Sequence, residues 1–220
     1  MLRYKLGKGN RDERGFAALR VIAGSAKGRS LKAVPGKNTR PTTDKVKEAI
    51  FSMIGPFFEG GMVLDLFAGT GGLGIESLSR GMDRGVFVDL DGGSIEVIKQ
   101  NVQAAGVSEN AEIYRTEALR AVKALAKRGL QFRLVFLDPP YRMREMDALI
   151  TELAERNLLA PRAKIVVEHD AEHAYPESID GFEQLKRSQY GDAAVTIYRY
   201  GPSIDEQGEG EVMNEANDGE

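Results

Sequence analysis

The sequence predicts an α/β fold in which a mostly parallel sheet is covered by helices on both faces. From residue 44 onward, short apolar runs alternate with segments of helical periodicity. The apolar runs are continuous rather than alternating with polar residues, as in strands that are buried on both faces. Two further strand-like runs within 182–200 meet at Gly191, and they predict a final hairpin that adds an antiparallel edge.

The individual elements follow in order along the chain. Residues 18–34 hold two runs of apolar and β-branched residues, which predict a hairpin closed by Pro35-Gly36. A helical period starts at Asp44, and Gly55-Pro56 ends it. We expect strands at 62–66, 85–89, 111–114, 133–137 and 164–168, and helices after these strands that end near Arg80, Gly106, Arg128 and Asn157.

Charge is distributed unevenly along the 220 residues, although the formal net charge is only −3. Residues 1–49 carry 13 Lys/Arg and 4 Asp/Glu, whereas residues 203–220 carry 7 acidic residues and no basic one. A basic beginning, a mildly acidic middle and an acidic end predict a polyanionic partner that is bound at one end of the protein.

Composition excludes several classes of site. Without cysteine there is no disulfide, thiolate metal site or cysteine nucleophile, and His169 and His173 are too few for a three-histidine zinc site. No apolar run approaches the ~20 residues of a membrane helix, and no signal peptide is evident. We expect a soluble, cytoplasmic protein that contains no metal.

A glycine-rich segment follows the first strand and opens a helix. Gly69, Gly71 and Gly74 have the spacing G-x-G-x-x-G, which lets a backbone turn sharply and present helix N–H groups to a ligand. The spacing alone also fits a tight turn without a ligand. Asp65 at the strand end favours a cationic ligand over a pyrophosphate.

Two acids stand where the next strand ends. Asp89 lies 18 residues beyond Gly71, at the position where Rossmann-like folds present an acid to ribose hydroxyls. A strand-end acid can instead cap the following helix, and Asp91 suits that role better because it directly precedes the helical period. We therefore assign Asp89 to ribose and Asp91 to capping.

The tetrapeptide Asp138-Pro139-Pro140-Tyr141 follows the fourth strand. Proline after Asp138 favours an extended backbone, so the segment forms a stiff rim with a carboxylate and an aromatic ring. Such a rim suits a planar base that carries a polar exocyclic group. The alternative is a proline turn with a core tyrosine.

Together these residues resemble a known family. Residues 65–71 combined with 138–141 resemble class I S-adenosylmethionine-dependent methyltransferases, and the Asp-Pro-Pro-Tyr element resembles those that act on exocyclic amines of nucleobases. Residues 20–24 (RVIAG), 27–29 (KGR) and 40–48 (RPTTDKVKE) resemble the 16S ribosomal RNA guanine-N2 methyltransferases, the RsmD-like enzymes. The resemblance runs from about residue 20 to 199.

The resemblance implies a Rossmann-like class I methyltransferase fold with a seven-stranded sheet of order 3-2-1-4-5-7-6 and a small N-terminal hairpin and helix extension. It implies methyl transfer from S-adenosylmethionine to the N2 amine of one guanine in 16S rRNA. The implied cofactor contacts are Asp65, Phe67, Ala68, Gly69, Thr70, Gly71, Asp89, Leu90 and Glu117, with Leu90 and Glu117 at the adenine. Asp138 would bind the target amine as a base or an orienting group, next to Pro139 and Pro140, and Tyr141 would stack on the guanine.

The basic N-terminal part is the expected RNA contact. Its candidate cations are Arg20, Lys27, Arg29, Lys32, Lys37 and Arg40. They could instead form a solvated face, and Arg40 with Asp44 could face the active site. We expect a basic leader (1–17), an RNA-binding hairpin and loop (18–43), a catalytic domain (44–202) and a disordered acidic tail (203–220), acting as a monomer on 16S rRNA, the small subunit or its assembly intermediate.

Other functions remain as alternatives. A NAD(P)-dependent oxidoreductase would share the glycine loop, but it leaves 138–141 and the basic N-terminal part unexplained. An adenine-N6 or cytosine-N4 DNA methyltransferase shares the tetrapeptide, but its usual large target-recognition region is missing here, where there is only a small N-terminal addition. A non-catalytic RNA-binding module would have no selective affinity for the cofactor.

Overall fold

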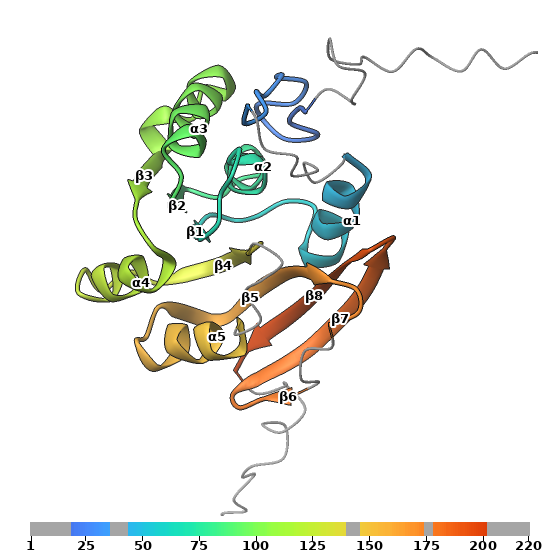
Figure 1. Cartoon of the computed structure of the whole chain (residues 1–220), viewed down its shortest axis with the longest axis vertical. Helices are drawn as coiled ribbons and strands as arrows, with labels where there is room; N and C mark the ends of the chain where they lie inside the picture. The colour runs from blue at the N-terminus through green and yellow to red at the C-terminus, as the bar shows by residue number, and fades with distance from the viewer. Residues whose placement is uncertain (1–18, 36–43, 140–145, 174–177, 202–220) are drawn as a thin grey trace, which may run out of the picture.

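The computed structural model describes residues 19–35, 44–139, 146–173 and 178–201. In this part of the chain one central sheet has eight strands in the order β3-β2-β1-β4-β5-β8-β7-β6 (Figure 1). The strands are β1 (Met62–Asp65), β2 (Arg84–Asp89), β3 (Ala111–Arg115), β4 (Phe132–Leu137), β5 (Leu159–Asp170), β6 (Ser178–Ile179), β7 (Phe182–Tyr190) and β8 (Ala193–Tyr200).

The predicted strand order is confirmed. Strands β1 to β5 pair in parallel, and β8 pairs antiparallel with both β5 and β7. Counted as seven main strands, this is the order 3-2-1-4-5-7-6. The two-residue β6 adds a short antiparallel edge to β7 that the sequence did not indicate.

Helices cover both faces of the sheet, each with its own apolar layer. On one face lie α1 (Asp44–Ile54), α2 (Gly72–Ser79) and α3 (Gly92–Ala105), and on the other lie α4 (Ala118–Ala126) and α5 (Met146–Glu155) (Figure 1). The expected capping role of Asp91 is confirmed, since its carboxylate accepts a hydrogen bond from Ser94 N at 2.9 Å. Gly106 ends the same helix with a φ of 74°.

The hairpin expected in residues 18–34 is a short antiparallel pairing in the described residues, where Val21 N donates to Arg29 O and Leu31 N donates to Leu19 O. Among the described residues of this segment there is a single antiparallel bridge, between Arg20 and Ser30, and no strand. The backbone N–H groups of Ile22 and Ala23 donate to the Glu76 carboxylate of α2, at 2.8 and 2.9 Å. Because these groups bond to α2, they cannot extend a ladder between two strands.

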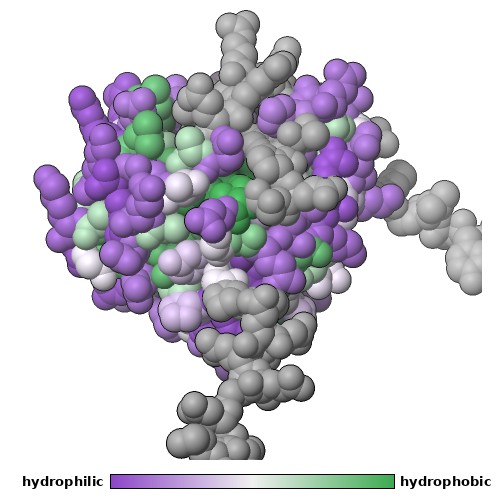
Figure 2. Space-filling model, turned by 90° about the horizontal axis from the view of Figure 1, so that it is seen from below, coloured by the Kyte–Doolittle hydropathy of each residue, from purple (hydrophilic) through white to green (hydrophobic). Residues whose placement is uncertain are grey.

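The outer surface is polar over most of the face seen in Figure 2, where small apolar areas are separated by hydrophilic residues. The helices in the described part of the chain are too short or too polar to cross a bilayer. The fold thus places its apolar residues mainly between the sheet and the two helix layers.

Candidate active site

The three acids singled out by sequence come together at one edge of the sheet. Asp65 ends β1, Asp89 ends β2, and Asp138 directly follows β4. Because β2, β1 and β4 are adjacent and parallel, their carboxyl ends meet at this edge. The order of the strands along the sheet reverses between β1 and β4, which is where open α/β sheets place their ligand sites.

The glycine loop between β1 and α2 is folded tightly against the end of β2. Ala68 N donates to Val88 O at 2.9 Å, and Gly71 N donates to Ala68 O at 2.6 Å. Gly69 and Gly71 have φ values of 52° and 76°, a region that residues with a Cβ rarely adopt. Glycine at these positions is therefore required by the turn itself.

Asp65 is a buried carboxyl group beneath this loop. It is 3% exposed, and one of its oxygens accepts a hydrogen bond from Gly74 N at 3.3 Å. Burial, with a smaller contribution from the negative charge of Asp89, raises its pKa to about 7. The two groups that lower it are the backbone N–H groups of Gly74 and Phe67. A cationic ligand would relieve this cost of ionisation.

The Asp89 carboxylate bonds to the backbone of the glycine loop and to the backbone just after β2. One carboxylate oxygen accepts from Gly69 N and the other from Asp91 N, both at 2.8 Å. The next residue, Leu90, is 68% exposed. Glu117 is exposed at the N-terminus of α4, with no side-chain cap bond. This arrangement offers two acids and one apolar side chain to a ligand.

Asp138 stands at the end of β4 near two further carboxylates. Solvent reaches the residue, yet the surrounding protein desolvates its carboxyl group, and Glu168 of β5 and Asp65 add negative charge. These effects together raise its pKa well above the usual range of aspartate. Pro139 is half-buried, whereas Pro140 and Tyr141 lie outside the described residues. Sequence reasoning missed Glu168, although the expected strand 164–168 ended on this acid.

The predicted RNA-binding cations that are described all reach solvent. Arg20, Lys27, Arg29 and Lys32 are exposed, and Lys37 and Arg40 lie outside the described residues. Arg20 pairs with Asp44 at 2.9 Å, and Lys32 Nζ donates to the Gln100 side chain at 2.8 Å.

A buried asparagine connects this basic segment to the glycine loop. Asn101 of α3 accepts from Lys32 N at 2.7 Å and donates to Lys32 O at 3.0 Å. The same amide nitrogen donates to Thr70 O at 2.8 Å. The segment that carries the predicted RNA contacts is thus bonded, through one side chain, to the loop that carries the predicted cofactor contacts.

A second connection, also missed from sequence, centres on Glu76 of α2. Besides Ile22 N and Ala23 N, its fully buried carboxylate accepts from Arg80 Nε at 2.8 Å and lies 3.6 Å from Lys47 Nζ. Lys47 is itself 1% exposed. The signal was a single acid within the otherwise small and apolar helix GLGIESLS.

The donor set at this edge matches a positively charged organic cofactor. The buried Asp65 has no cation among the groups that shift its pKa, and exposed Leu90 offers an apolar surface next to Asp89. Within the described residues no group of three or more His, Cys, Asp or Glu has the arrangement of a metal site.

Comparison with known proteins agrees with this picture. The family described as "Conserved hypothetical protein 95" matches residues 19–199. The chain is 51% identical to "Putative rRNA methyltransferase YlbH" of Bacillus subtilis, over 82% of this chain and 98% of that protein. It is 37% identical to "Ribosomal RNA small subunit methyltransferase D" of Haemophilus influenzae, over 82% of this chain and 93% of that protein. A solved structure of "Putative methyltransferase yhhF from Escherichia coli" has a TM-score of 0.72 at 30% identity, covering 83% of this chain and 97% of that one.

Proposed function

This chain belongs to the family described as "Conserved hypothetical protein 95", and on that premise we propose that it methylates the exocyclic N2 amine of one guanine in 16S rRNA. Methylation of ribosomal RNA with S-adenosylmethionine as the donor is the activity that its relatives' names and its class I methyltransferase fold support. The choice of guanine N2 and of a 16S site rests on the residues of the sequence motifs. The reaction belongs to the cytoplasm, where ribosomal RNA is processed in bacteria.

The carboxyl edge of the sheet has the groups to hold this cofactor. S-adenosylmethionine supplies a methyl group on a sulfonium, which is a good leaving group, so the chain needs only to bind and orient it. We assign the methionine part to Asp65 and the loop of Phe67, Ala68, Gly69, Thr70 and Gly71. Asp89 accepts the ribose hydroxyls, and Leu90 and Glu117 contact the adenine. Ionised Asp65 is stabilised when a cation binds beside it.

Asp138 is the group that acts on the nucleophile. The amine nitrogen of guanine is a poor nucleophile because its lone pair is conjugated with the ring. By accepting an amine hydrogen, Asp138 turns the lone pair toward the methyl group, and its raised pKa makes it a stronger base than an ordinary aspartate. Alignment of the two reactants supplies ~7–11 kcal/mol of the lowering of the barrier. Pro139 and Pro140 stiffen this rim, and Tyr141 stacks on the base.

RNA affinity comes in part from the basic N-terminal segment. Arg20, Lys27, Arg29 and Lys32 are exposed and available to phosphates, and we assign Lys37 and Arg40 to the same surface. Asn101 bonds this segment to the glycine loop, so RNA bound here is held in a fixed relation to the cofactor.

One observation carries the proposal: Asp65, Asp89 and Asp138 converge at the edge where the strand order reverses. The test is incubation of naked 16S rRNA, small subunits and assembly intermediates with labelled S-adenosylmethionine, followed by mapping of the modified nucleotide. Label on a guanine N2 of 16S rRNA supports the proposal. Label on an adenine or cytosine amine would assign the site to a different base, and absence of both cofactor binding and transfer would refute methyl transfer altogether.

An Asp138→Asn variant separates chemistry from binding. The variant keeps its shape but is a far weaker base, so we expect transfer to fall by ~10²–10⁴-fold while calorimetric affinity for S-adenosylmethionine stays close to that of the unmodified protein. A variant that retains full turnover would remove Asp138 from the mechanism.

A further inference from the structure

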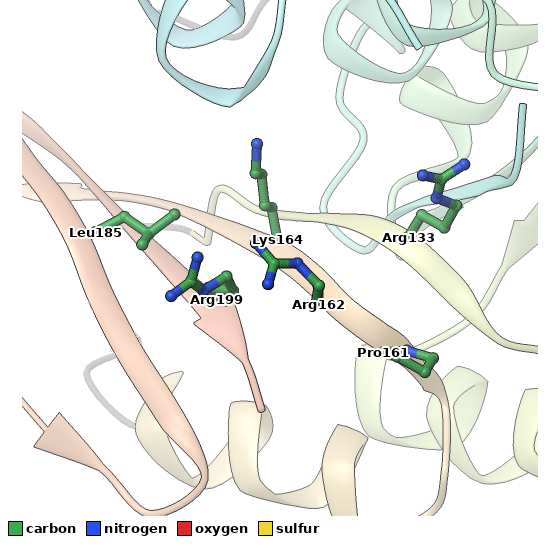
Figure 3. A pocket seen from close by; sticks show the side chains of 6 residues that line it. All are labelled: Arg133, Pro161, Arg162, Lys164, Leu185 and Arg199. Carbon is green, nitrogen blue, oxygen red and sulfur yellow. The ribbon is translucent and has the colours of Figure 1, made fainter. Parts of the chain in front are cut away.

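Away from the carboxyl edge, the sheet carries a cluster of basic side chains at the start of β4. Arg133 of β4, Arg162 and Lys164 of β5, and Arg199 of β8 line a cavity of about 360 Å³, together with Pro161 and Leu185 (Figure 3). In Figure 3, Arg162 and Arg199 flank Lys164, which extends toward α1. Asp138 is five residues beyond Arg133, so the cluster lies ~16 Å away along the strand from the proposed active site.

Charge in this cavity is poorly balanced. Among the described residues, the acid that pairs with a cation of this cavity is Glu183, which forms an ion pair with Arg199. The Nε atom of Arg199 is buried, with no hydrogen-bond partner among the described residues. Burial and the positive charges of Arg162 and Arg199 lower the pKa of Lys164. An anion in the cavity would satisfy the donor and reduce the repulsion.

The backbone geometry of this place is also unusual. Arg162 has a φ of 62°, in the left-handed region that a residue with a Cβ rarely adopts. Strained residues of this kind occur preferentially at ligand sites. The strain lies next to an irregularity in register between β4 and β5, at Phe132 and Leu134.

An exposed aromatic ring stands on the loop that borders the cavity. Phe57 is 64% exposed, whereas its neighbour Phe58 packs edge-on against Phe51. Two cations of the cavity hold this loop: Lys164 Nζ donates to Ile54 O at 2.7 Å, and Arg133 donates to Glu59 O at 3.0 Å. A basic cavity whose cations are bonded to a segment with an exposed aromatic ring is a combination that suits single-stranded nucleic acid, with the ring stacked on a base.

We propose that the cavity lined by Arg133, Arg162, Lys164 and Arg199 binds a phosphodiester of single-stranded RNA, and that Phe57 stacks on an adjacent base. The identification of the strand as RNA rests on the proposed function. The molecule then contacts its RNA at the basic N-terminal segment, at the active edge and at this second basic site.

The test measures the dissociation constant of a fluorescein-labelled, mixed-sequence single-stranded RNA at several salt concentrations. Arg162→Glu should weaken binding at least ~10-fold at low salt and reduce the slope of log K against log salt by ~0.7. Phe57→Ala should weaken binding ~5-fold or more at every salt concentration, because stacking does not depend on counterion release.

Two exposed residues on the opposite helix layer provide matched controls. Arg120→Glu makes the same charge reversal on α4, and Leu119→Ala removes a side chain that is 43% exposed. Both should bind RNA as the unmodified protein does, and circular dichroism should show all four variants folded. Unmodified RNA affinity and salt slope in both Arg162→Glu and Phe57→Ala would overturn the proposal.

Calorimetry with inorganic phosphate tests whether the cavity binds free phosphate instead of an RNA phosphodiester. Saturable phosphate binding that Arg162→Glu abolishes, together with unchanged RNA affinity, would assign the cavity to free phosphate and overturn the RNA assignment. Cofactor binding is measured separately, so failure of methyl transfer would count against the proposed function without deciding this site. Retained turnover at saturating RNA with a raised KM in Arg162→Glu supports a binding role remote from the chemistry.

Discussion

Substitution of Glu76 tests whether the buried ion network fixes the N-terminal segment to the catalytic fold. Glu76→Ala removes the acceptor of two backbone N–H groups, leaves Lys47 buried beside a like-charged Arg80, and opens a cavity under the segment. Breaking a buried ion pair by removing one partner costs about 3–5 kcal/mol. For a chain of this size, that corresponds to a fall in Tm of roughly 6–20 °C.

The assay is thermal and urea unfolding followed by circular dichroism, with Glu96→Ala as the matched control. Glu96 also pairs with a lysine on a helix, but its side chain is 64% exposed and that of Lys99 is 55% exposed, so its loss should cost no more than ~1 kcal/mol. Glu76→Gln keeps an acceptor oxygen and should fall between the two. If Glu76→Ala were as stable as Glu96→Ala, the network would not anchor the segment and the reasoning would fail.

The same network affects how RNA binding by the N-terminal segment should be tested. Deleting residues 1–43 removes the phosphate-binding cations, but it also removes both backbone donors of Glu76 and the buried side chains of Val21 and Leu31. A loss of RNA affinity after that deletion could therefore come from lost phosphate contacts or from a destabilised fold. Charge reversal of exposed Lys27 or Arg29 leaves the network in place and isolates the electrostatic contribution.

Three other outcomes are expected. The pKa of Asp65 is about 7 in the folded protein against 3.8 as its ordinary value, so its contribution to stability is present below pH ~4 and lost as pH rises through 7. Binding of a cationic cofactor favours ionised Asp65, so the affinity for the cofactor should rise from pH 6 to 8, and a proton should be released on binding. Calorimetry in buffers of different ionisation enthalpy detects the released proton. An affinity that does not depend on pH would contradict this expectation. Gly24→Ala should lower the free energy of unfolding more than Gly28→Ala does. The two glycines have nearly the same φ (84° and 83°), but a Cβ at Gly24 would lie 1.7 Å from Ser79 O, whereas a Cβ at Gly28 would meet nothing within 4 Å. Equal urea midpoints of the two variants would contradict this expectation. Deleting residues 203–220 changes the net charge from −3 to +4, so RNA affinity in a fluorescence titration should rise, most at low salt, and an unchanged affinity would argue against the charge reasoning.

Much of the fold was predictable because the local sequence signals for strands and helix ends agree with the positions of these elements in the sheet and its helix layers. Strands buried on both faces are apolar throughout, and helix limits are marked by residues with a local mechanism, as Asp91 and Gly106 show for α3. The active edge was predictable for the same reason, because each acid lies at the carboxyl end of its strand. Asp65, Asp89 and Asp138 needed only the strand order to be brought together.

The features that were missed depend on contacts between distant parts of the chain. Glu76 looks like an ordinary helical acid until the segment of Ile22 and Ala23 covers it. The basic cavity joins Arg133, Arg162 and Arg199 from three strands, and no local pattern marks them as neighbours. The expected hairpin is shorter than the alternating residues indicated, because the N–H groups of Ile22 and Ala23 bond to the Glu76 side chain, which lies far along the sequence.

The anchoring of the N-terminal segment sets an order of assembly during synthesis. Ile22 lies 54 residues before Glu76, and Lys32 lies 69 residues before Asn101. At about 5–20 residues per second, the translating ribosome needs roughly 3–14 s after Lys32 to make its partner. The Glu76 carboxylate is made 44 residues after Lys32 and the Asn101 amide 69 residues after it, so the segment first lacks both partners and then gains them one after the other. The basic segment is thus made before α2 and α3 and docks only after both exist.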